Sequence, residues 1–266
     1  MQTCIRWAGS KRQLLPDLQT MHGGHFRRYV EPFCGSACLF FALNPPEAVL
    51  GDLNIELITA FRVLQVNASV VAECLKRLPI GKGAYYKVRA QDPRTLLEAE
   101  RAARFLYLNR YCFNGIYRTN SAGNFNVPFG PQKNVTPFPT ELLSDISIAL
   151  RKTLLVHGDF ERTLSFVREG DFVFIDPPYV SETARMFNEY GPTPFTSNDL
   201  DRLSLQLDRI DSLGASFVIS YTATKKAKSF FEKWSLRRVW VKRNVAGFAS
   251  KRRGAYELLA TNIRET

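Results

Sequence analysis

The sequence predicts an α/β protein built on one mainly parallel sheet with helices on both faces. Short apolar runs rich in β-branched and aromatic residues alternate with segments of helical periodicity, as expected for strands that are buried on both sides. Polar turns follow four of these runs: EPFCG, GDLN, GDF and DPPY. Ligands of such sheets bind beyond the carboxyl ends of the strands, so these turns are the first candidates for a functional site.

The individual elements are expected at the following positions. Strands are expected at 28–33, 48–52, 154–159, 171–176 and 215–220, and helices at 37–43, 54–66 and 197–214. The last helix has an apolar stripe of Leu200, Leu203, Leu207 and Ile210, with an N-cap at Ser197 or Asn198 and an end at Gly214. A hairpin made of the basic run at 236–243 and YELLATN at 256–262 is expected to close the fold.

The composition favours a polyanionic partner. The 266 residues are 45% hydrophobic, which supports a sizeable core, and 36 Lys+Arg against 25 Asp+Glu give a net charge of +11. Nucleic acid and an anionic membrane are the two partners that such a charge attracts. A membrane is disfavoured, because no stretch approaches the roughly 18–20 apolar residues of a spanning helix and the N-terminus lacks the apolar core of a signal peptide.

The cysteines and histidines indicate no metal site. The five cysteines are odd in number and form no CxxC pair, and the three histidines are scattered. A disulfide framework and a zinc site are therefore not expected, and a reducing cytoplasm is the expected compartment.

The positive charge is concentrated in two zones. Residues 101–140 carry five basic residues and no acid, and residues 225–253 carry eleven basic residues against Glu232. The first zone contains 107–130, which is rich in Asn, Gly and aromatic residues and has weak periodicity. This segment is expected to be part of an insertion that offers a surface, and the patchy charge is typical of a nucleic-acid footprint.

Three turns are candidates for ligand binding, each with a plainer structural alternative. In EPFCGSA, Gly35 allows close approach of the backbone to a ligand, but the segment also suits an ordinary loop. Asp52 stands where ribose hydroxyls are held in nucleotide-binding sheets, or it caps the helix that begins near Asn54. Near the N-terminus, Trp7 offers a stacking surface and Lys11 a positive charge, and each also suits an ordinary interface.

The DPPY turn at 176–179 suits methyl transfer to an exocyclic amino nitrogen. The lone pair of such a nitrogen is delocalised into the base, and two hydrogen-bond acceptors at fixed separation free it. The Asp176 carboxylate and the Pro177 carbonyl provide them, and the prolines make the turn rigid. The ring of Tyr179 offers a face on which an extruded base can stack. Stacking of a base on an aromatic ring stabilises binding by on the order of 1–3 kcal/mol. The alternative is a tight turn that merely ends a strand.

Eight motifs in one order, taken together, resemble the Dam-type adenine-N6 DNA methyltransferases, the D12 group with the α order of motifs. They are WAGSK, EPFCG, DLNIEL, LNRYCFNGIYR, GNFNVPFG, GDF, DPPY and ELLATN, and they extend from Trp7 to Asn262. The resemblance implies a Rossmann-like S-adenosylmethionine-dependent methyltransferase sheet at 1–56 and 143–266. It also implies an inserted target-recognition domain at 57–142, mainly helical with a β-hairpin.

The resemblance further implies roles for single residues. The donor S-adenosylmethionine, with S-adenosylhomocysteine as product, would contact Trp7, Lys11, Pro32, Phe33, Gly35, Asp52, Asp159, Phe160 and Asp176. The flipped adenine would lie at Asp176, Pro177 and Tyr179. Double-stranded DNA would contact a hairpin within 107–130 through Arg110, Phe113, Asn114, Ile116, Arg118, Asn120 and Pro128. Phe113 would intercalate, and Arg118 would read a guanine.

Three positions depart from the family pattern or vary within it, and the target sequence, the oligomeric state and the substrate stay open. Ala37 replaces a frequent glycine, Pro131 replaces a basic residue after Gly130, and 182–200 is the variable loop after DPPY. GATC accompanies this recognition segment in related enzymes. A monomer is the family default, and a cognate restriction endonuclease is a conceivable partner. Methylation of cytosine N4, of RNA or of a protein glutamine, and a catalytically silent DNA-binding subunit, remain as alternatives.

Overall fold

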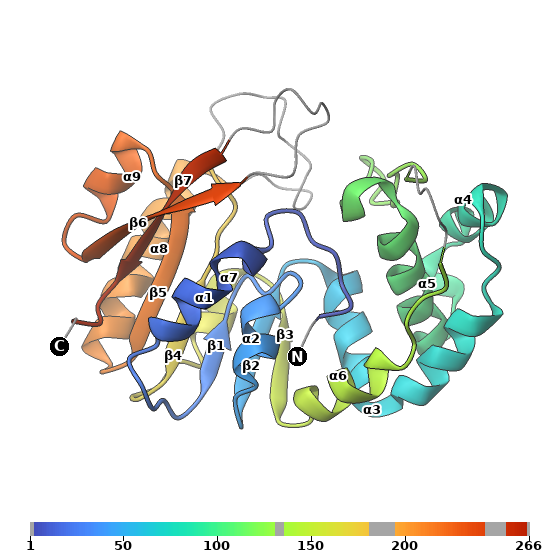
Figure 1. The fold of residues 1–266 in the computed structure, drawn as a ribbon, viewed down its shortest axis with the longest axis horizontal. Coiled ribbons are helices and arrows are strands. Elements are labelled where there is room, and N and C mark those ends of the chain that lie inside the picture. Colours follow the sequence, from blue (N-terminus) through green and yellow to red (C-terminus); the bar gives the residue numbers. More distant parts are fainter. Residues whose placement is uncertain (1–2, 131–135, 181–194, 243–253, 265–266) are drawn as a thin grey trace.

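The structure, a computed structural model, describes residues 3–130, 136–180, 195–242 and 254–264. Within them, seven strands form one sheet in the order β3-β2-β1-β4-β5-β7-β6 (Figure 1). The strands are β1 Tyr29–Glu31, β2 Ala48–Asp52, β3 Thr153–His157, β4 Phe172–Ile175, β5 Ser216–Thr222, β6 Ser235–Lys242 and β7 Gly254–Thr261. The strands β3, β2, β1, β4 and β5 are parallel, whereas β7 pairs antiparallel with β5 and β6.

Helices cover both faces of the sheet, as the continuous apolar strands require. They are η1 Lys11–Leu14, α1 Leu15–Thr20, α2 Cys38–Leu43, α7 Phe160–Leu164, α8 Ser197–Ser212 and α9 Lys225–Phe230. Strand β4 shows the two-sided burial: Phe172 and Phe174 belong to a core that includes α1 and α2, and Val173 and Ile175 to a second core that includes α7 and α8. The predicted doubly covered α/β sheet is confirmed.

Helix α8 and the closing hairpin were both predicted from the sequence, and one detail of α8 was predicted incorrectly. The stripe Leu200, Leu203, Leu207 and Ile210 of α8 is buried as expected. Its N-cap, however, is Thr196, because the Thr196 hydroxyl accepts a hydrogen bond from the Asp199 amide, while Asp199 accepts one from Thr196. The expected cap at Ser197 or Asn198 is therefore wrong. The closing hairpin is confirmed as β6 and β7.

A group of helices lies beside the sheet, beyond β3 (Figure 1). It consists of α3 Ile55–Arg77, α4 Lys82–Ala90, η2 Pro93–Thr95, α5 Glu98–Tyr111, η3 Phe113–Gly115 and α6 Leu142–Leu150. Helix α3 continues eleven residues past the predicted end at 66 (77 − 66), through a non-helical residue at Asn67. It packs against α5 and α6. The predicted domain boundary at 56/57 falls in the first turn of α3, and the division itself stays a prediction.

One helix within the described residues has the length and apolar character of a membrane span. This is α3, whose mean hydropathy reaches 1.4 over 18 residues, so the expectation that no stretch approaches such a span is wrong for this segment. Its side chains Leu57, Phe61, Leu64, Val71 and Leu75 are buried in the core of the protein. A core helix of a globular protein meets the same criteria, and α3 packs into such a core here.

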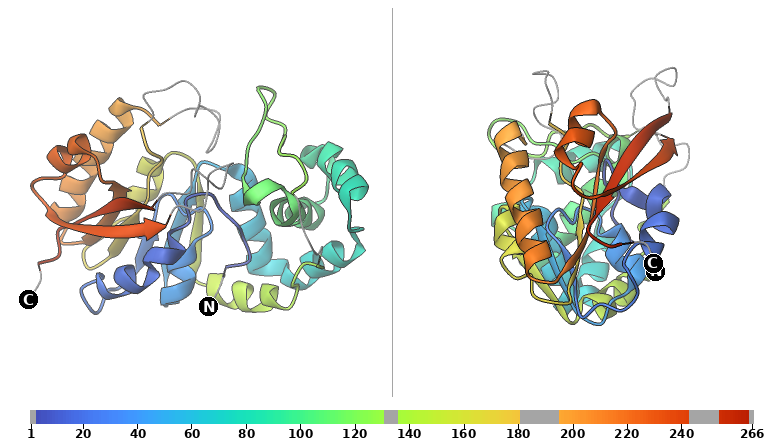
Figure 2. Two further views of the ribbon diagram at one scale, coloured as in Figure 1. Left: turned by 45° about the horizontal axis from the view of Figure 1, so that its top comes forward. Right: turned by 90° about the vertical axis from the view of Figure 1, so that its left-hand side faces the viewer.

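The hairpin within 107–130 begins directly after α5. Residues up to Tyr111 belong to α5, and Phe113–Gly115 form the turn η3. Two antiparallel bridges join the arms of the hairpin, Cys112 with Phe129 at its base and Thr119 with Phe125 near its tip. The Phe113 amide also donates to the carbonyl of Pro128 at 2.9 Å. Figure 2 shows this segment as a loop that projects beyond the neighbouring helices. Phe113 and Asn114 therefore lie in the first arm of the hairpin, in the turn η3 between the two bridges.

Candidate active site

The parallel strands bring the conspicuous turns to one edge of the sheet. EPFCG follows β1, Asp52 ends β2, Asp159 follows β3 and DPPY follows β4. Because these four strands are neighbours and parallel, their carboxyl ends share one side of the molecule. The predicted donor and base residues are thus gathered from segments that lie far apart in the sequence.

Lys11 and Asp176 form a buried ion pair at the centre of this edge. The Lys11 Nζ lies 2.7 Å from Asp176 Oδ1 and 2.9 Å from Oδ2, and it also donates to the Gly9 carbonyl at 3.1 Å. The side chains are only 8% and 18% exposed. Burial raises the pKa of Asp176 to about 6, although the charge of Lys11 opposes the rise. The pair therefore holds a carboxyl group whose pKa lies above the ordinary range of an aspartate.

Asp52 fixes the first turn instead of capping a helix. Its Oδ2 accepts a hydrogen bond from the Gly35 amide and its Oδ1 one from the Asn54 amide, each at 2.9 Å. The N-cap of α3 is Asn54, whose side chain accepts from the Leu57 amide. Burial raises the pKa of Asp52, and the two amide bonds counteract part of this rise. Of the two sequence interpretations, the helix cap at Asp52 is wrong.

The first turn is tight and lies directly under Trp7. Gly35 has φ +45°, and a Cβ at this position would lie 2.6 Å from Trp7 Cδ1. Ala37 also has a left-handed φ of 50°, a backbone conformation that favours glycine. Trp7 in turn stacks on Tyr117, with ring centroids 6.0 Å apart. The indole thus joins the first turn to the segment that follows η3.

The two residues after β3 have structural partners of their own. Asp159 caps α7 through the Glu161 amide and pairs with Arg202 at 2.6 Å. Phe160 packs against Phe33 of the first turn, with ring centroids 5.4 Å apart. The aromatic contact brings the GDF turn beside EPFCG. A donor contact of Asp159 and Phe160 stays a prediction.

Tyr179 is held by residues from β5 and β7. Its hydroxyl donates to Glu257 at 2.8 Å, and its ring meets the Tyr221 ring at 75° with centroids 5.3 Å apart. The Val180 amide donates to the Tyr221 hydroxyl at 3.0 Å. The sequence interpretation gave no role to Tyr221 or Glu257. The available signal was an acid inside the apolar run GAYELLAT, where a buried carboxylate needs a partner.

Comparison with known proteins decides the family of this site. A family model described as D12 class N6 adenine-specific DNA methyltransferase matches residues 7–245. The chain belongs to this family. It is 34% identical to the type II methyltransferase M1.LlaDCHI of Lactococcus lactis, covering 97% of this chain and 94% of the relative. It is 32% identical to M.MjaIII of Methanocaldococcus jannaschii (97% and 98% covered) and 28% to the DNA adenine methylase of Escherichia coli K12 (96% and 93%). The predicted resemblance and the adenine-specific DNA methyltransferase activity are thereby confirmed.

The predicted DNA-contact residues of this D12-class enzyme fall into two groups. The exposed residues are Asn114, Arg118, Asn120 and Pro128, while Arg110, Phe113 and Ile116 are half-buried. Arg118 Nε donates to Asn126 Oδ1 at 2.8 Å, between the two arms of the hairpin. Asn120 Oδ1 accepts from the amides of Ala122 and Asn124, so this side chain shapes the hairpin turn. The contacts of these residues with DNA stay predictions.

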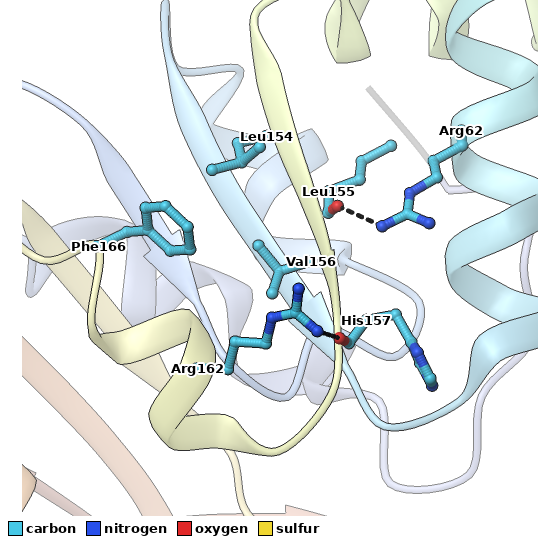
Figure 3. A pocket seen from close by; sticks show the side chains of 7 residues that line it. All are labelled: Arg62, Leu154, Leu155, Val156, His157, Arg162 and Phe166. Atoms are coloured by element: carbon cyan, nitrogen blue, oxygen red, sulfur yellow. Dashed lines mark hydrogen bonds between the residues drawn. The ribbon is translucent and has the colours of Figure 1, made fainter.

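A cavity of about 370 Å³ lies apart from these residues, at the free edge of β3 (Figure 3). Its lining includes Arg62, Arg162 and Phe166, and no residue of the predicted site. Arg62 donates to the Leu155 carbonyl at 2.9 Å and Arg162 to the His157 carbonyl at 3.1 Å. The two guanidinium groups therefore cap carbonyls of an edge strand, which protects the edge against pairing with another chain.

Proposed function

We propose that the protein transfers the methyl group of S-adenosylmethionine to N6 of an adenine that has been extruded from duplex DNA. The observation that carries this proposal is the Asp176 carboxylate, held by Lys11 at the end of β4 and followed by the Tyr179 ring. A carboxylate has about four lone-pair positions, so Asp176 still has capacity to accept a hydrogen bond from N6 while it is bound to Lys11.

The residues around the first turn fit the donor. Glu31 Oε2 is buried without a hydrogen-bond partner among the described residues, at the start of EPFCG. A buried polar atom normally has a hydrogen-bond partner, and a donor group of a bound ligand would supply one here. The Asp52 oxygens, each with one amide bond, retain lone pairs for ribose hydroxyls. S-adenosylmethionine, when bound, supplies an activated methyl group next to a positively charged sulfur.

The chain's own residues then act on the base. The basic zones bind phosphates, and the segment 112–130 opens the base stack beside the target. Tyr179 stacks on the extruded adenine, and Asp176 and the Pro177 carbonyl accept hydrogen bonds from the two N6 N–H groups. The positive charge that develops on N6 lies beside the Asp176 carboxylate, which stabilises it. The N6 proton leaves to water after transfer.

The direct test is nucleoside analysis of DNA treated with the protein and labelled S-adenosylmethionine. We expect the label in N6-methyladenine. Label in N4-methylcytosine, or in neither nucleoside, would overturn the proposal. Single-molecule sequencing of plasmid DNA from expressing cells would give the target sequence. GATC is the first candidate, and methylation of a GATC duplex can be compared with methylation of a duplex of scrambled sequence. A cognate endonuclease in the same system also belongs to the proposal, because two of the relatives are named type II methyltransferases.

Gly35→Ala is expected to weaken S-adenosylmethionine binding by roughly tenfold or more. The new Cβ would collide with Trp7, and a left-handed φ disfavours alanine, so the first turn would shift away from Asp52. Isothermal titration calorimetry measures the effect. Gly83→Ala in α4 is the matched control, because a Cβ there meets nothing within 4 Å. Equal donor affinity of the two variants would remove the first turn from the donor site.

Arg118→Ala is expected to relax discrimination at one guanine of the target by roughly 1–3 kcal/mol. The exposed guanidinium is oriented by Asn126 and suits a bidentate contact to guanine. The readout is the ratio of kcat/KM for the target duplex to that for a duplex with this base pair changed. Arg118→Lys keeps the charge but not the fork, so it should retain duplex affinity and lose discrimination. An unchanged ratio in both variants would contradict the assignment.

A further inference from the structure

Glu257 is a buried carboxylate in the middle of β7. Its side chain is 5% exposed, and its strand runs between β5 and β6. The neighbouring residues Leu258 and Leu259 are also buried. Removing a carboxylate from water is costly unless hydrogen-bond donors or opposite charges compensate, so its partners indicate what it does.

Those partners belong to the proposed catalytic site. The Tyr179 hydroxyl lies 2.8 Å from Glu257 Oε1 and 2.9 Å from Oε2, and the Ser220 hydroxyl donates to Oε2 at 3.1 Å. Ser220, on β5, is fully buried. A carboxylate that accepts hydrogen bonds from two hydroxyl groups is satisfied without leaving the core. Its bonds tie the DPPY turn to the antiparallel end of the sheet.

The contacts hold the Tyr179 ring on several sides. Glu257 holds the hydroxyl end, the Tyr221 ring packs edge-on against it, and the Lys11 ammonium lies 5.7 Å from its centroid. The torsion about the bond from Cβ to a tyrosine ring is broad and weakly restrained on its own. An anchor at the hydroxyl fixes the plane of the ring, which is the surface that a stacked base would meet.

We propose that Glu257 is a positioning residue for methyl transfer, which orients the Tyr179 ring and sets the charge balance around Asp176. This inference deepens the proposed function and rests on it. Glu257 does not touch the base or the donor in this scheme. It acts through the Tyr179 hydroxyl on the stacking surface, and through space on the ion pair of Lys11 and Asp176.

The second part of the proposal follows from the contacts that link Glu257 to Asp176. Glu257 binds the Tyr179 hydroxyl, and Lys11, which pairs with Asp176 at 2.7 Å, lies over the Tyr179 ring. Lys11 from η1 carries the compensating positive charge, while Glu257 from β7, Glu31 from β1 and the Cys38 thiol of α2 lie near enough to interact with the same carboxyl group. Glu257 adds to the rise in the pKa of Asp176, so loss of its charge lowers that pKa. Glu257→Gln should therefore extend activity to lower pH.

Two substitutions separate position from charge. Glu257→Gln keeps an oxygen that can accept from the Tyr179 hydroxyl, so it should keep base stacking and shift the acid limb of the kcat profile to lower pH. Glu257→Ala removes the anchor and should weaken stacking by roughly tenfold. Stacking is measured by the fluorescence of a duplex with 2-aminopurine at the target position. Glu73→Gln, at an exposed position of α3, is the matched control.

A double-mutant cycle with Tyr179→Phe decides whether Glu257 acts through the hydroxyl. In the Tyr179→Phe background, Glu257→Ala should add little further loss of stacking; the same loss in both backgrounds would overturn the proposal. An unshifted acid limb in Glu257→Gln would overturn its charge component. If Glu257→Ala does not fold, Ser220→Ala replaces it, with a smaller expected loss. The fluorescence measurement requires no methyl transfer, so it tests the role of Glu257 separately from the proposed reaction. Failure of the proposed reaction would instead appear in nucleoside analysis of DNA treated with the unsubstituted protein.

Discussion

Asp176→Ala is expected to abolish methyl transfer, with a fall in kcat of at least about a thousandfold, while the affinity for duplex DNA changes little. The substitution removes both the acceptor for an N6 hydrogen and the negative charge beside the nitrogen as it becomes positive. DNA binding is expected to depend mainly on the basic zones, which are formed by other segments. A labelled-methyl assay under saturating donor and duplex measures kcat, and a gel-shift titration measures the affinity.

The structure supplies the controls for this experiment. Asp176→Ala leaves Lys11 buried without its main partner, so reduced stability alone could lower the activity. The double variant Lys11→Met/Asp176→Ala removes the lone charge and should regain thermal stability without regaining methyl transfer. Asp145→Ala in α6, at an exposed position, should leave both readouts unchanged. Full methyl transfer by Asp176→Ala would refute the proposed mechanism.

The fold was largely predictable because its signals are local. Strand β4 is a continuous apolar run, and α8 has a four-residue stripe with the correct period, so both were located from sequence. Errors occurred where neighbouring signals compete. The cap of α8 lies at Thr196, one residue before the predicted Ser197 and two before Asn198. Helix α3 runs through Asn67 because its packing against α5 and α6 outweighs a local break in periodicity.

The candidate site was predictable only in part, since its contacts join distant segments. The Asn109 side chain accepts from the Arg6 amide at 2.8 Å and donates to the Arg6 carbonyl at 2.6 Å, across 103 residues. Trp7 stacks on Tyr117, and Tyr179 bonds to Glu257 across 78 residues. No periodicity or turn signal encodes such pairings. The sequence located the turns after each strand, and the fold determined which side chains meet there.

The same contacts connect the predicted donor and DNA segments. Arg6 and Trp7 precede Lys11, and both contact residues between Asn109 and Tyr117. A Cβ at Gly115 would lie 2.4 Å from Arg6 Cβ, so the two segments are in close packing contact. The N-terminal strap from Arg6 to Lys11 therefore has one end against the insertion and the other on Asp176. Lys11 is the residue of this strap that contacts the proposed catalytic carboxylate, Asp176.

Lys11→Met is expected to move the acid limb of methyl transfer to higher pH. Burial raises the pKa of Asp176 to about 6 in the presence of Lys11, whose charge lowers it, so removal of the lysine raises this pKa further. In the proposed mechanism, protonated Asp176 has lost the negative charge that stabilises the developing positive charge on N6. At pH 7 the rate should fall by roughly tenfold or more, and it should recover as the pH rises through the new pKa.

The measurement is kcat against pH at saturating S-adenosylmethionine, because Lys11 is also a predicted donor contact and saturation removes an effect on binding. Lys152→Met, at an exposed position before β3, should give the native profile. A loss by one constant factor at every pH would show that Lys11 does not act through the Asp176 charge. Glu257 opposes Lys11 at the same carboxyl group, so the acid limbs should fall in the order Glu257→Gln, native protein, Lys11→Met from low to high pH. Any other order would contradict an electrostatic balance of these two residues around Asp176.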